Sequence, residues 1–222
     1  MEKDIAIIFD FNGTCIFDGK IHGKAWETYI EELTLQPVSR KASEEHIAGH
    51  APKEILEHFL GYELTDNMVT QLSEEKERIY RNLLVKEDIQ LAPGLQDFLN
   101  YLLLAQVKRT IATTADLGNM NLYFERYNLG MWFRWEDVVV GSGNIPLKPH
   151  PDLYLAAIEK LGTTSDKVVA FEDSKIGIKA AYSAGIRHII AVTGDSHDDS
   201  LIAMPGVYAK ISNFTELNPD NF

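Results

Sequence analysis

Side chains that can carry out chemistry follow four short apolar runs of the sequence. They are Asp10 and Asn12 after IAIIF, Thr113 and Thr114 at the end of TIAT, Lys148 beyond VVVG, and Glu172 and Asp173 after VVAF. If these runs are strands of a parallel sheet, their carboxyl ends open into one crevice. A nucleophile, a hydroxyl donor, a cation and an acidic pair in that crevice are the groups that metal-assisted phosphoryl transfer requires.

The residue types indicate a role for each group. The carboxylate of Asp10 can attack phosphorus and form an aspartyl-phosphate, which splits one displacement into two easier steps. A carboxylate that faces a phosphate dianion needs positive charge, and Mg²⁺ held by Asp10 and Asp173, with Glu172 beside them, would supply it. Lys148 would neutralise the transferring group, while Thr113 and the amides of the FNGT turn would donate hydrogen bonds to the phosphoryl oxygens.

Each residue taken singly also has a structural interpretation. Asn12 and Gly13 form a common turn dipeptide, and Asp173 is a suitable cap for a helix that starts at Ser174. A structural role is the simpler explanation for every one of these residues except Asp10. Because the residues recur together at four predicted strand ends, their joint occurrence favours a functional site.

Five apolar runs predict the strands that position these side chains. They cover residues 5–9, 110–113, 138–141, 168–171 and 188–192. Each is apolar on both faces, which is typical of parallel strands covered by helices. From residue 110 onward the runs alternate with helical patterns. The sequence therefore predicts an α/β fold, a Rossmann-like doubly wound parallel sheet.

Residues 16–90 interrupt this alternation with helical patterns alone. One of them, HGKAWETYIEEL, places Ala25, Trp26, Tyr29, Ile30 and Leu33 on a single face. We therefore expect an inserted all-α cap domain at 16–90 and a core domain formed by 1–15 and 91–222. The substrate crevice of such a core lies at the carboxyl ends of its strands.

Composition and charge exclude several classes of partner. The chain has 222 residues and a formal net charge of −12, which disfavours binding to nucleic acid or to an anionic membrane surface. The single cysteine excludes an internal disulfide. We expect no signal peptide and no bilayer-spanning run, a cytoplasmic location, and a monomer or weak dimer that takes a small phosphorylated metabolite.

Four segments resemble the ordered motifs of the haloacid-dehalogenase superfamily. They are FDFNGT, TIATT, LKPHPDLY and VVAFEDSKIGIKAAYSAGI. The chain is most similar to the branch of β-phosphoglucomutase and the small-sugar phosphatases with a helical cap. The resemblance implies that Asp10 is the nucleophile, that Thr113 binds phosphate and that Lys148 is the lysine of the third motif. It also implies Mg²⁺ bound by Asp10, the backbone carbonyl of Asn12, Glu172 and Asp173.

Asn12 departs from the pattern of this family. Its phosphatases and mutases carry a second aspartate there, which protonates the leaving oxygen as a general acid. An amide cannot do so near neutral pH, and such catalysis is worth roughly 10²–10⁴-fold. Four explanations remain open: a slow or specialised phosphatase for good leaving groups, an engineered aspartate-to-asparagine variant, a phosphometabolite-binding protein without turnover, and deamidation of the Asn12–Gly13 pair.

Several cap residues match substrate-binding positions of the mutase branch. Lys76 interrupts an apolar stripe of the long cap helix, either to reach a second phosphate or sugar hydroxyls or to extend its head into water. His22 matches a histidine near the hinge, and Gly49 matches a cap loop. The arginine expected three residues after Gly49 is Pro52, and Lys53 is a candidate replacement.

The leading prediction is a Mg²⁺-dependent phosphohydrolase that acts through phospho-Asp10. A phosphomutase of the β-phosphoglucomutase type is the alternative enzyme, although Asn12 and Pro52 weigh against it. The acids Glu172 and Asp173 disfavour a dehalogenase. A phosphonoacetaldehyde hydrolase would need Lys53 as a Schiff-base lysine at a shifted spacing.

Overall fold

The structure is a computed structural model that describes residues 5–141, 145–194 and 198–222. The chain forms two compact units. The core unit comprises Met1–Phe17 and Gln90–Phe222, and the cap unit comprises Asp18–Ile89. The sequence expectation places the insert at 16–90, so the two sets of limits differ by one or two residues at each end.

A parallel sheet in the order β3-β2-β1-β4-β5-β6 forms the centre of the core unit. The strands are β1 (Ala6–Phe9), β2 (Lys108–Thr113), β3 (Val139–Val140), β4 (Val168–Glu172), β5 (His188–Val192) and β6 (Val207–Ile211). This arrangement confirms the predicted α/β Rossmann-like fold. The strand β1 lies between β2 and β4, with Phe9 opposite Ile111 on one side and Phe171 on the other. The residues that follow β1, β2 and β4 therefore emerge at the same edge of the sheet.

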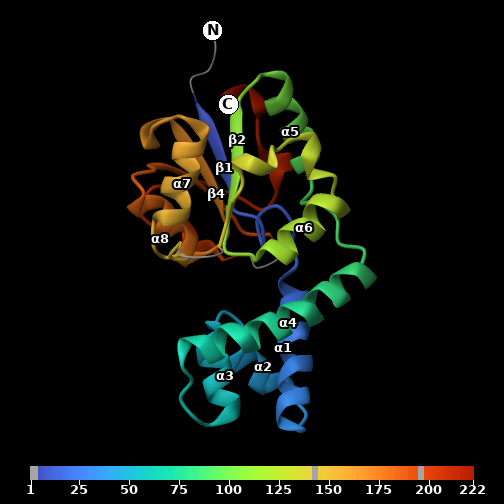
Figure 1. Cartoon of the computed structure of the whole chain (residues 1–222). Helices are drawn as coiled ribbons and strands as arrows, with labels where there is room; N and C mark the ends of the chain where they lie inside the picture. Colours follow the sequence, from blue (N-terminus) through green and yellow to red (C-terminus); the bar gives the residue numbers. More distant parts are fainter. Residues whose placement is uncertain (1–4, 142–144, 195–197) are drawn as a thin grey trace. The chain divides into compact units, whose positions relative to one another are not determined.

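Helices cover both faces of this sheet (Figure 1). They are α5 (Leu95–Leu104), α6 (Leu117–Arg126), α7 (Asp152–Leu161) and α8 (Lys175–Ser183). Figure 1 shows α7 and α8 on one side of the sheet and α5 and α6 on the other. Short 3-10 helices occur at Leu129–Met131, Trp135–Asp137, Ser165–Lys167, Asp199–Ala203, Phe214–Glu216 and Pro219–Asn221.

Alternate residues of β1 and β4 point to opposite faces, so each face has its own core. Ile8 and Ala170 belong to the cluster that α7 and α8 complete. Phe9 and Phe171 point the other way and stack with ring centroids 5.1 Å apart. Phe98 of α5 meets both rings edge-on. Burial on both faces removes large apolar areas from water, which holds the ends of β1 and β4 in register.

The cap unit is built from four helices, α1 (Gly19–Thr34), α2 (Arg40–His46), α3 (Pro52–Leu60) and α4 (Asp66–Lys86). Ser39 and Thr65 cap α2 and α4 by accepting hydrogen bonds from the backbone amides of Ala42 and Met68. The buried face of α1 is formed by Ile21, Ala25, Trp26, Tyr29 and Ile30. This face agrees with the predicted stripe except that Leu33 is only partly buried.

Candidate active site

Lys148 forms a bridge between the ends of β1 and β4. Its Nζ donates to Oδ1 of Asp10 and to Oε1 of Glu172, at 2.6 Å in each case. All three side chains are buried, and Glu172 is fully enclosed. The amide of Asp10 donates to the carbonyl of Phe171 at 2.9 Å, which continues the pairing of β1 with β4 beyond the last strand residue. The parallel register therefore brings Asp10 beside Glu172.

Asp173 joins this pair to form an acidic cluster. Asp10, Glu172 and Asp173 each offer one oxygen, and these atoms lie within 4.8 Å of one another. The three carboxylates face one ammonium group, that of Lys148, so the cluster carries an excess of negative charge. Hard oxygen ligands at this separation could hold a divalent cation. The sequence-predicted residues of the first and fourth strand ends are thus adjacent.

Burial and mutual repulsion change the protonation of the cluster. Burial raises the pKa of Asp10 from 3.8 to about 7, against the attraction of Lys148 and with the repulsion of Glu172. Burial, followed by repulsion from Asp10 and Glu172, also raises the pKa of Asp173 well above its ordinary value. Burial alone would lower the pKa of Lys148, but the ion pairs with Asp10 and Glu172 outweigh it and raise that pKa above its ordinary value. Lys148 therefore stays charged.

Two glycines make room for the carboxylates of the cluster. A Cβ on Gly13 would lie 1.9 Å from Oδ2 of Asp173, and Gly13 has a φ of +78°. A Cβ on Gly177 would lie 1.9 Å from Oε1 of Glu172. Both contacts are far shorter than any real Cβ contact, so each carboxylate occupies the space that a side chain would fill. Gly13 is needed for its backbone conformation as well.

Thr113 lies at the end of β2, next to the end of β1 in the sheet. The residue is buried, and its hydroxyl oxygen accepts a hydrogen bond from the amide of Ala115 at 3.1 Å. Its hydroxyl hydrogen remains able to donate to an oxyanion. Thr114, the second threonine predicted at this strand end, is exposed.

Asn12 lies in the turn after β1 and contacts a helix that the sequence did not link to it. Its Nδ2 donates to the hydroxyl of Tyr123, in α6, at 2.7 Å. The Tyr123 ring stacks on Phe11 with centroids 4.6 Å apart. The turn is closed by the amide of Gly13, which donates to the carbonyl of Ile16 at 2.8 Å. The side-chain amide of Asn12 is therefore held in a defined orientation.

Sequence reasoning missed two further residues that contact Glu172. The hydroxyl of Tyr154, in α7, donates to Oε1 of Glu172 at 2.9 Å, and the Lys148 ammonium lies 5.0 Å from the centre of the Tyr154 ring. Ser174 donates to Oε2 through its hydroxyl at 3.1 Å. The available signal for Tyr154 was its position three residues after the second proline of LKPHPDLY. Whether its side chain faces the site depends on how α7 is rotated about its axis.

The cap unit contains its own buried polar cluster. Lys76 Nζ lies 2.8 Å from Nδ1 of His22 and 2.6 Å from an oxygen of Glu77. The hydroxyl of Tyr80 donates to Asp18 at 2.5 Å, and Nε2 of His22 lies 3.3 Å from the same oxygen of Asp18. Lys76 is only 3% exposed. The interpretation that its ammonium group extends into water is therefore wrong. His22 and Lys76 are brought together.

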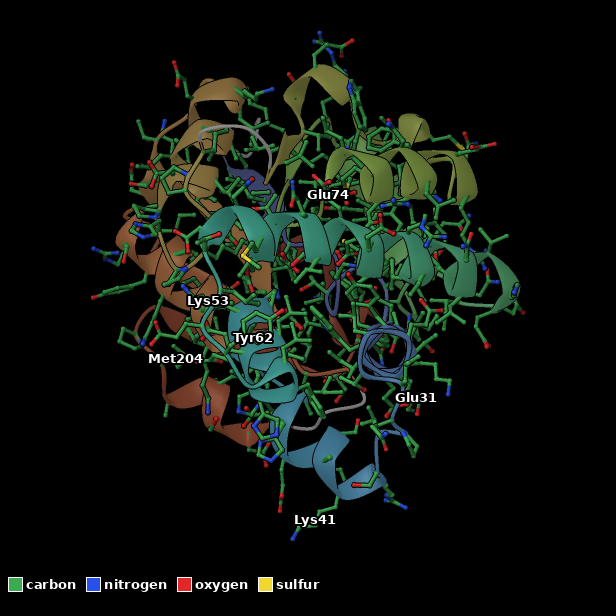
Figure 2. All side chains as sticks on the ribbon, turned by 60° about the horizontal axis from the view of Figure 1, so that its bottom comes forward. Glu31, Lys41, Lys53, Tyr62, Glu74 and Met204 are labelled. Atoms are coloured by element: carbon green, nitrogen blue, oxygen red, sulfur yellow. The ribbon has the colours of Figure 1, made fainter. Side chains whose placement is uncertain are left out.

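The other predicted cap residues lie apart from this cluster in the sequence and on different elements. Lys53 is near the start of α3 and is labelled in Figure 2. Its Nζ lies 3.4 Å from Asp66 and 3.9 Å from Glu57. Gly49 precedes α3, has a φ of +76°, and has open space where a Cβ would be. Its conformation explains the glycine without reference to a ligand.

Three similar proteins have names or descriptions that bear on function. The chain is 28% identical to a phosphorylated carbohydrates phosphatase of Thermotoga maritima, over 96% of each chain. It is 33% identical to a crystal structure of a HAD hydrolase, family IA, variant 3, from Entamoeba histolytica, with a TM-score of 0.90 over 96% and 95% of the chains. A variant of CbbY from Rhodobacter sphaeroides in complex with xylulose-(1,5)bisphosphate is 26% identical, with a TM-score of 0.80 over 98% and 97%.

Among the described residues, no helix combines the length and apolar character needed to cross a membrane.

A family model covers most of the chain. The model of the haloacid dehalogenase-like hydrolases matches residues 7–191, from the first strand through the acidic pair to the fifth strand. This confirms the resemblance of the four motifs. The chain belongs to the haloacid dehalogenase-like hydrolases and is an enzyme of that family.

Proposed function

We propose that the chain is a Mg²⁺-dependent phosphatase that transfers a phosphoryl group to Asp10 and then to water. The observation that carries this proposal is the position of Lys148 between Asp10 and Glu172, with Asp173 beside them. A nucleophile next to a permanent cation and an acidic cluster suits attack on a phosphate dianion.

The residues fit a hard divalent cation. Three carboxylates lie within 4.8 Å, and Gly13 leaves space for Asp173 where a side chain would displace it. Burial first, and then repulsion between the carboxylates, raises the pKa values of Asp10 and Asp173, and a bound cation would favour their ionised forms. Asp10, Asp173 and the backbone carbonyl of Asn12 would hold Mg²⁺, which would supply Lewis-acid polarisation of the phosphoryl oxygens.

The chain's own residues define the two steps. In the first, an oxygen of Asp10 bonds to phosphorus while the bond from phosphorus to the leaving oxygen breaks. Lys148 favours the ionised form of Asp10 and offsets the charge of the transferring group, and the Thr113 hydroxyl donates to a phosphoryl oxygen. In the second, the oxygen of water bonds to phosphorus while the bond from phosphorus to the Asp10 oxygen breaks. Phosphate leaves with the protons of that water, and the Asp10 carboxylate is restored.

Asn12 limits which leaving groups the first step accepts. Its amide neither gives nor takes a proton near neutral pH, so the proton for a leaving alkoxide must come from water or from the substrate. Acyl phosphates and similar substrates release a stable anion and need no such proton. We therefore infer that turnover is fastest with activated phosphates and slow with simple phosphate esters.

A small phosphorylated carbohydrate is the proposed natural substrate class. This proposal draws on the names of the similar proteins, one of which is a phosphorylated carbohydrates phosphatase. His22, Lys53 and Lys76 of the cap unit are the proposed contacts for the sugar or a second phosphate, with Gly49 supporting the loop before α3. A cytoplasmic location and a monomeric or weakly dimeric state stay predictions.

A substrate panel tests the proposal. Acetyl phosphate, p-nitrophenyl phosphate and a set of sugar phosphates are assayed with and without Mg²⁺, on the wild type and on Asp10→Asn. The account expects Mg²⁺-dependent release of phosphate from acetyl phosphate that Asp10→Asn abolishes. Release that persists in Asp10→Asn, or that needs no divalent ion, would contradict it.

A further inference from the structure

Glu172 has no lone pair left unused by the protein. Its Oε1 accepts from Lys148 Nζ at 2.6 Å and from the Tyr154 hydroxyl at 2.9 Å. Its Oε2 accepts from the amide of Asp173 at 3.1 Å, and from the amide and hydroxyl of Ser174 at 3.3 and 3.1 Å. A carboxylate has about four lone-pair sites, and five donors already surround this one.

The packing around Glu172 is equally restrictive. The residue is fully buried, and Gly177 lies so close that a Cβ there would fall 1.9–2.0 Å from its carboxyl atoms. The donors and this contact together fix the carboxylate in one position. Asp173, by contrast, is half-buried, and its backbone amide rather than its carboxylate takes part in holding Glu172.

Tyr154 shares an acceptor with Lys148. The phenol and the ammonium group both donate to Oε1, and the ammonium also lies 5.0 Å from the Tyr154 ring centre. Lys148 is therefore located by three groups, Asp10, Glu172 and the ring of Tyr154. Neither Glu172 nor Tyr154 needs to touch the substrate to affect where that ammonium lies.

We propose that Glu172 and Tyr154 are a positioning pair that fixes Lys148 against Asp10, and that Glu172 is not a direct ligand of the metal. The inference rests on the proposed function and divides the acidic cluster into two parts. Asp10 and Asp173 hold the ion, while Glu172 serves Lys148. It departs from the ligand set that the family resemblance implies for Glu172.

Measurements of metal binding and of turnover distinguish an acidic residue that ligates the metal from one that positions Lys148. Mn²⁺ binding is measured by the loss of the free-ion electron paramagnetic resonance signal, on the wild type, Glu172→Gln, Asp173→Asn and Tyr154→Phe. The proposal expects Asp173→Asn to lose binding and the other two to stay within about threefold of the wild type. With acetyl phosphate at saturating Mg²⁺, it expects kcat to fall roughly tenfold in Tyr154→Phe and further in Glu172→Gln, since each loses a hydrogen bond to a charged group.

The controls distinguish this proposal from the proposed function. Tyr208→Phe removes the hydroxyl of a half-exposed tyrosine on β6 and is expected to change neither measurement. Loss of Mn²⁺ binding in Glu172→Gln comparable to that in Asp173→Asn would overturn the positioning role. If the wild type bound no ion at all, the proposed function would fail instead.

A double-mutant cycle tests the pair without any metal. The unfolding equilibrium constants of Tyr154→Phe, Glu172→Gln and the double variant are compared in metal-free buffer. Direct coupling through Oε1 predicts that the double variant falls short of the product of the single effects by about tenfold. Multiplicative effects would show that the two side chains do not act together, and the proposal would be wrong.

Discussion

Asn12 donates a hydrogen bond from its Nδ2 to the hydroxyl of Tyr123 at 2.7 Å. The bond joins the turn after β1 to α6 and fixes the amide beside the proposed nucleophile Asp10. An aspartate at position 12 would accept from the same hydroxyl, so the exchange preserves the contact. An aspartate could therefore replace Asn12 without loss of the contact with Tyr123.

Asn12→Asp is expected to raise turnover of simple phosphate esters by roughly 10²–10⁴-fold, because it supplies the missing general acid. Turnover of acetyl phosphate should change far less, since its leaving group needs no proton. Steady-state kcat values on both substrates check this. No gain on the esters would contradict the proton-transfer explanation. An equal gain on both substrates would contradict its assignment to the leaving group and place the effect in the hydrolysis of phospho-Asp10, which both substrates share.

Mg²⁺ binding should depend on pH through Asp10. Its pKa is raised from 3.8 to about 7, so the folded metal-free protein holds a proton that the unfolded chain has lost. Metal-free stability therefore falls as pH rises from about 4 to 7, whereas Mg²⁺ must displace that proton and binds better over the same range. Below about pH 7 the affinity should drop roughly tenfold per pH unit.

Calorimetric titrations of Mg²⁺ in buffers of different ionisation enthalpy measure this effect. They should show more proton release on binding at about pH 6 than at about pH 8.5, because Asp10 is protonated at the lower pH and ionised at the higher. Equal affinity at both pH values would mean that Asp10 is ionised throughout, and the stated linkage would be wrong.

Gly13→Ala should abolish metal binding. The new methyl group would lie 1.9 Å from Oδ2 of Asp173, and the backbone there has a φ of +78°. The left-handed conformation alone costs about 1–2 kcal/mol for a residue with a Cβ. Thermal unfolding should show a lower Tm and no rise on addition of Mg²⁺.

Gly130→Ala is the matched control, because a Cβ at Gly130 meets nothing within 4 Å and the glycine lies outside the left-handed region. It should keep the Mg²⁺-induced rise. If Gly13→Ala keeps it too, Asp173 is not held where the account requires.

Tyr80→Phe should destabilise the cap unit. The Tyr80 hydroxyl donates to the buried Asp18 at 2.5 Å, and hydrogen bonds to charged groups are worth about 1.5–3 kcal/mol. Chemical denaturation should show that loss in the free energy of unfolding. Tyr62→Phe, at a cap tyrosine that is 54% exposed, should leave it unchanged. Equal stability of both variants would show that the Asp18 contact contributes little.

The ends of the buried strands could be predicted from the sequence, because each strand is a short apolar run that stops at a polar residue. The runs before Asp10 and Glu172 are buried on both faces, so each reads clearly as a parallel strand that ends in an acid. The strand β6 was missed because Val207–Ile211 alternates between half-buried and exposed residues, as an edge strand does. The helix α2 was missed because it has no buried residue and therefore no apolar periodicity.

The tyrosines of the site were not predictable from sequence for a different reason. Tyr123 and Tyr154 reach Asn12 and Glu172 from α6 and α7, at sequence separations of 111 and 18 residues. Which turn of a helix faces the sheet edge depends on how its apolar stripe packs. For the same reason, the contact between Lys76 and His22, which are 54 residues apart in the cap unit, could not be predicted from the sequence.

Covalent labelling of Asp10 tests the central claim most directly. The protein is mixed with acetyl phosphate and Mg²⁺, quenched in acid within a turnover and reduced with tritiated borohydride. This reduction converts an aspartyl-phosphate to tritium-labelled homoserine and releases the phosphate, and the protein is then digested for peptide mapping. The account predicts label on the peptide that contains Asp10, dependent on Mg²⁺ and absent in Asp10→Asn. Label on another residue, or phosphate release with no labelled peptide at any quench time, would contradict it.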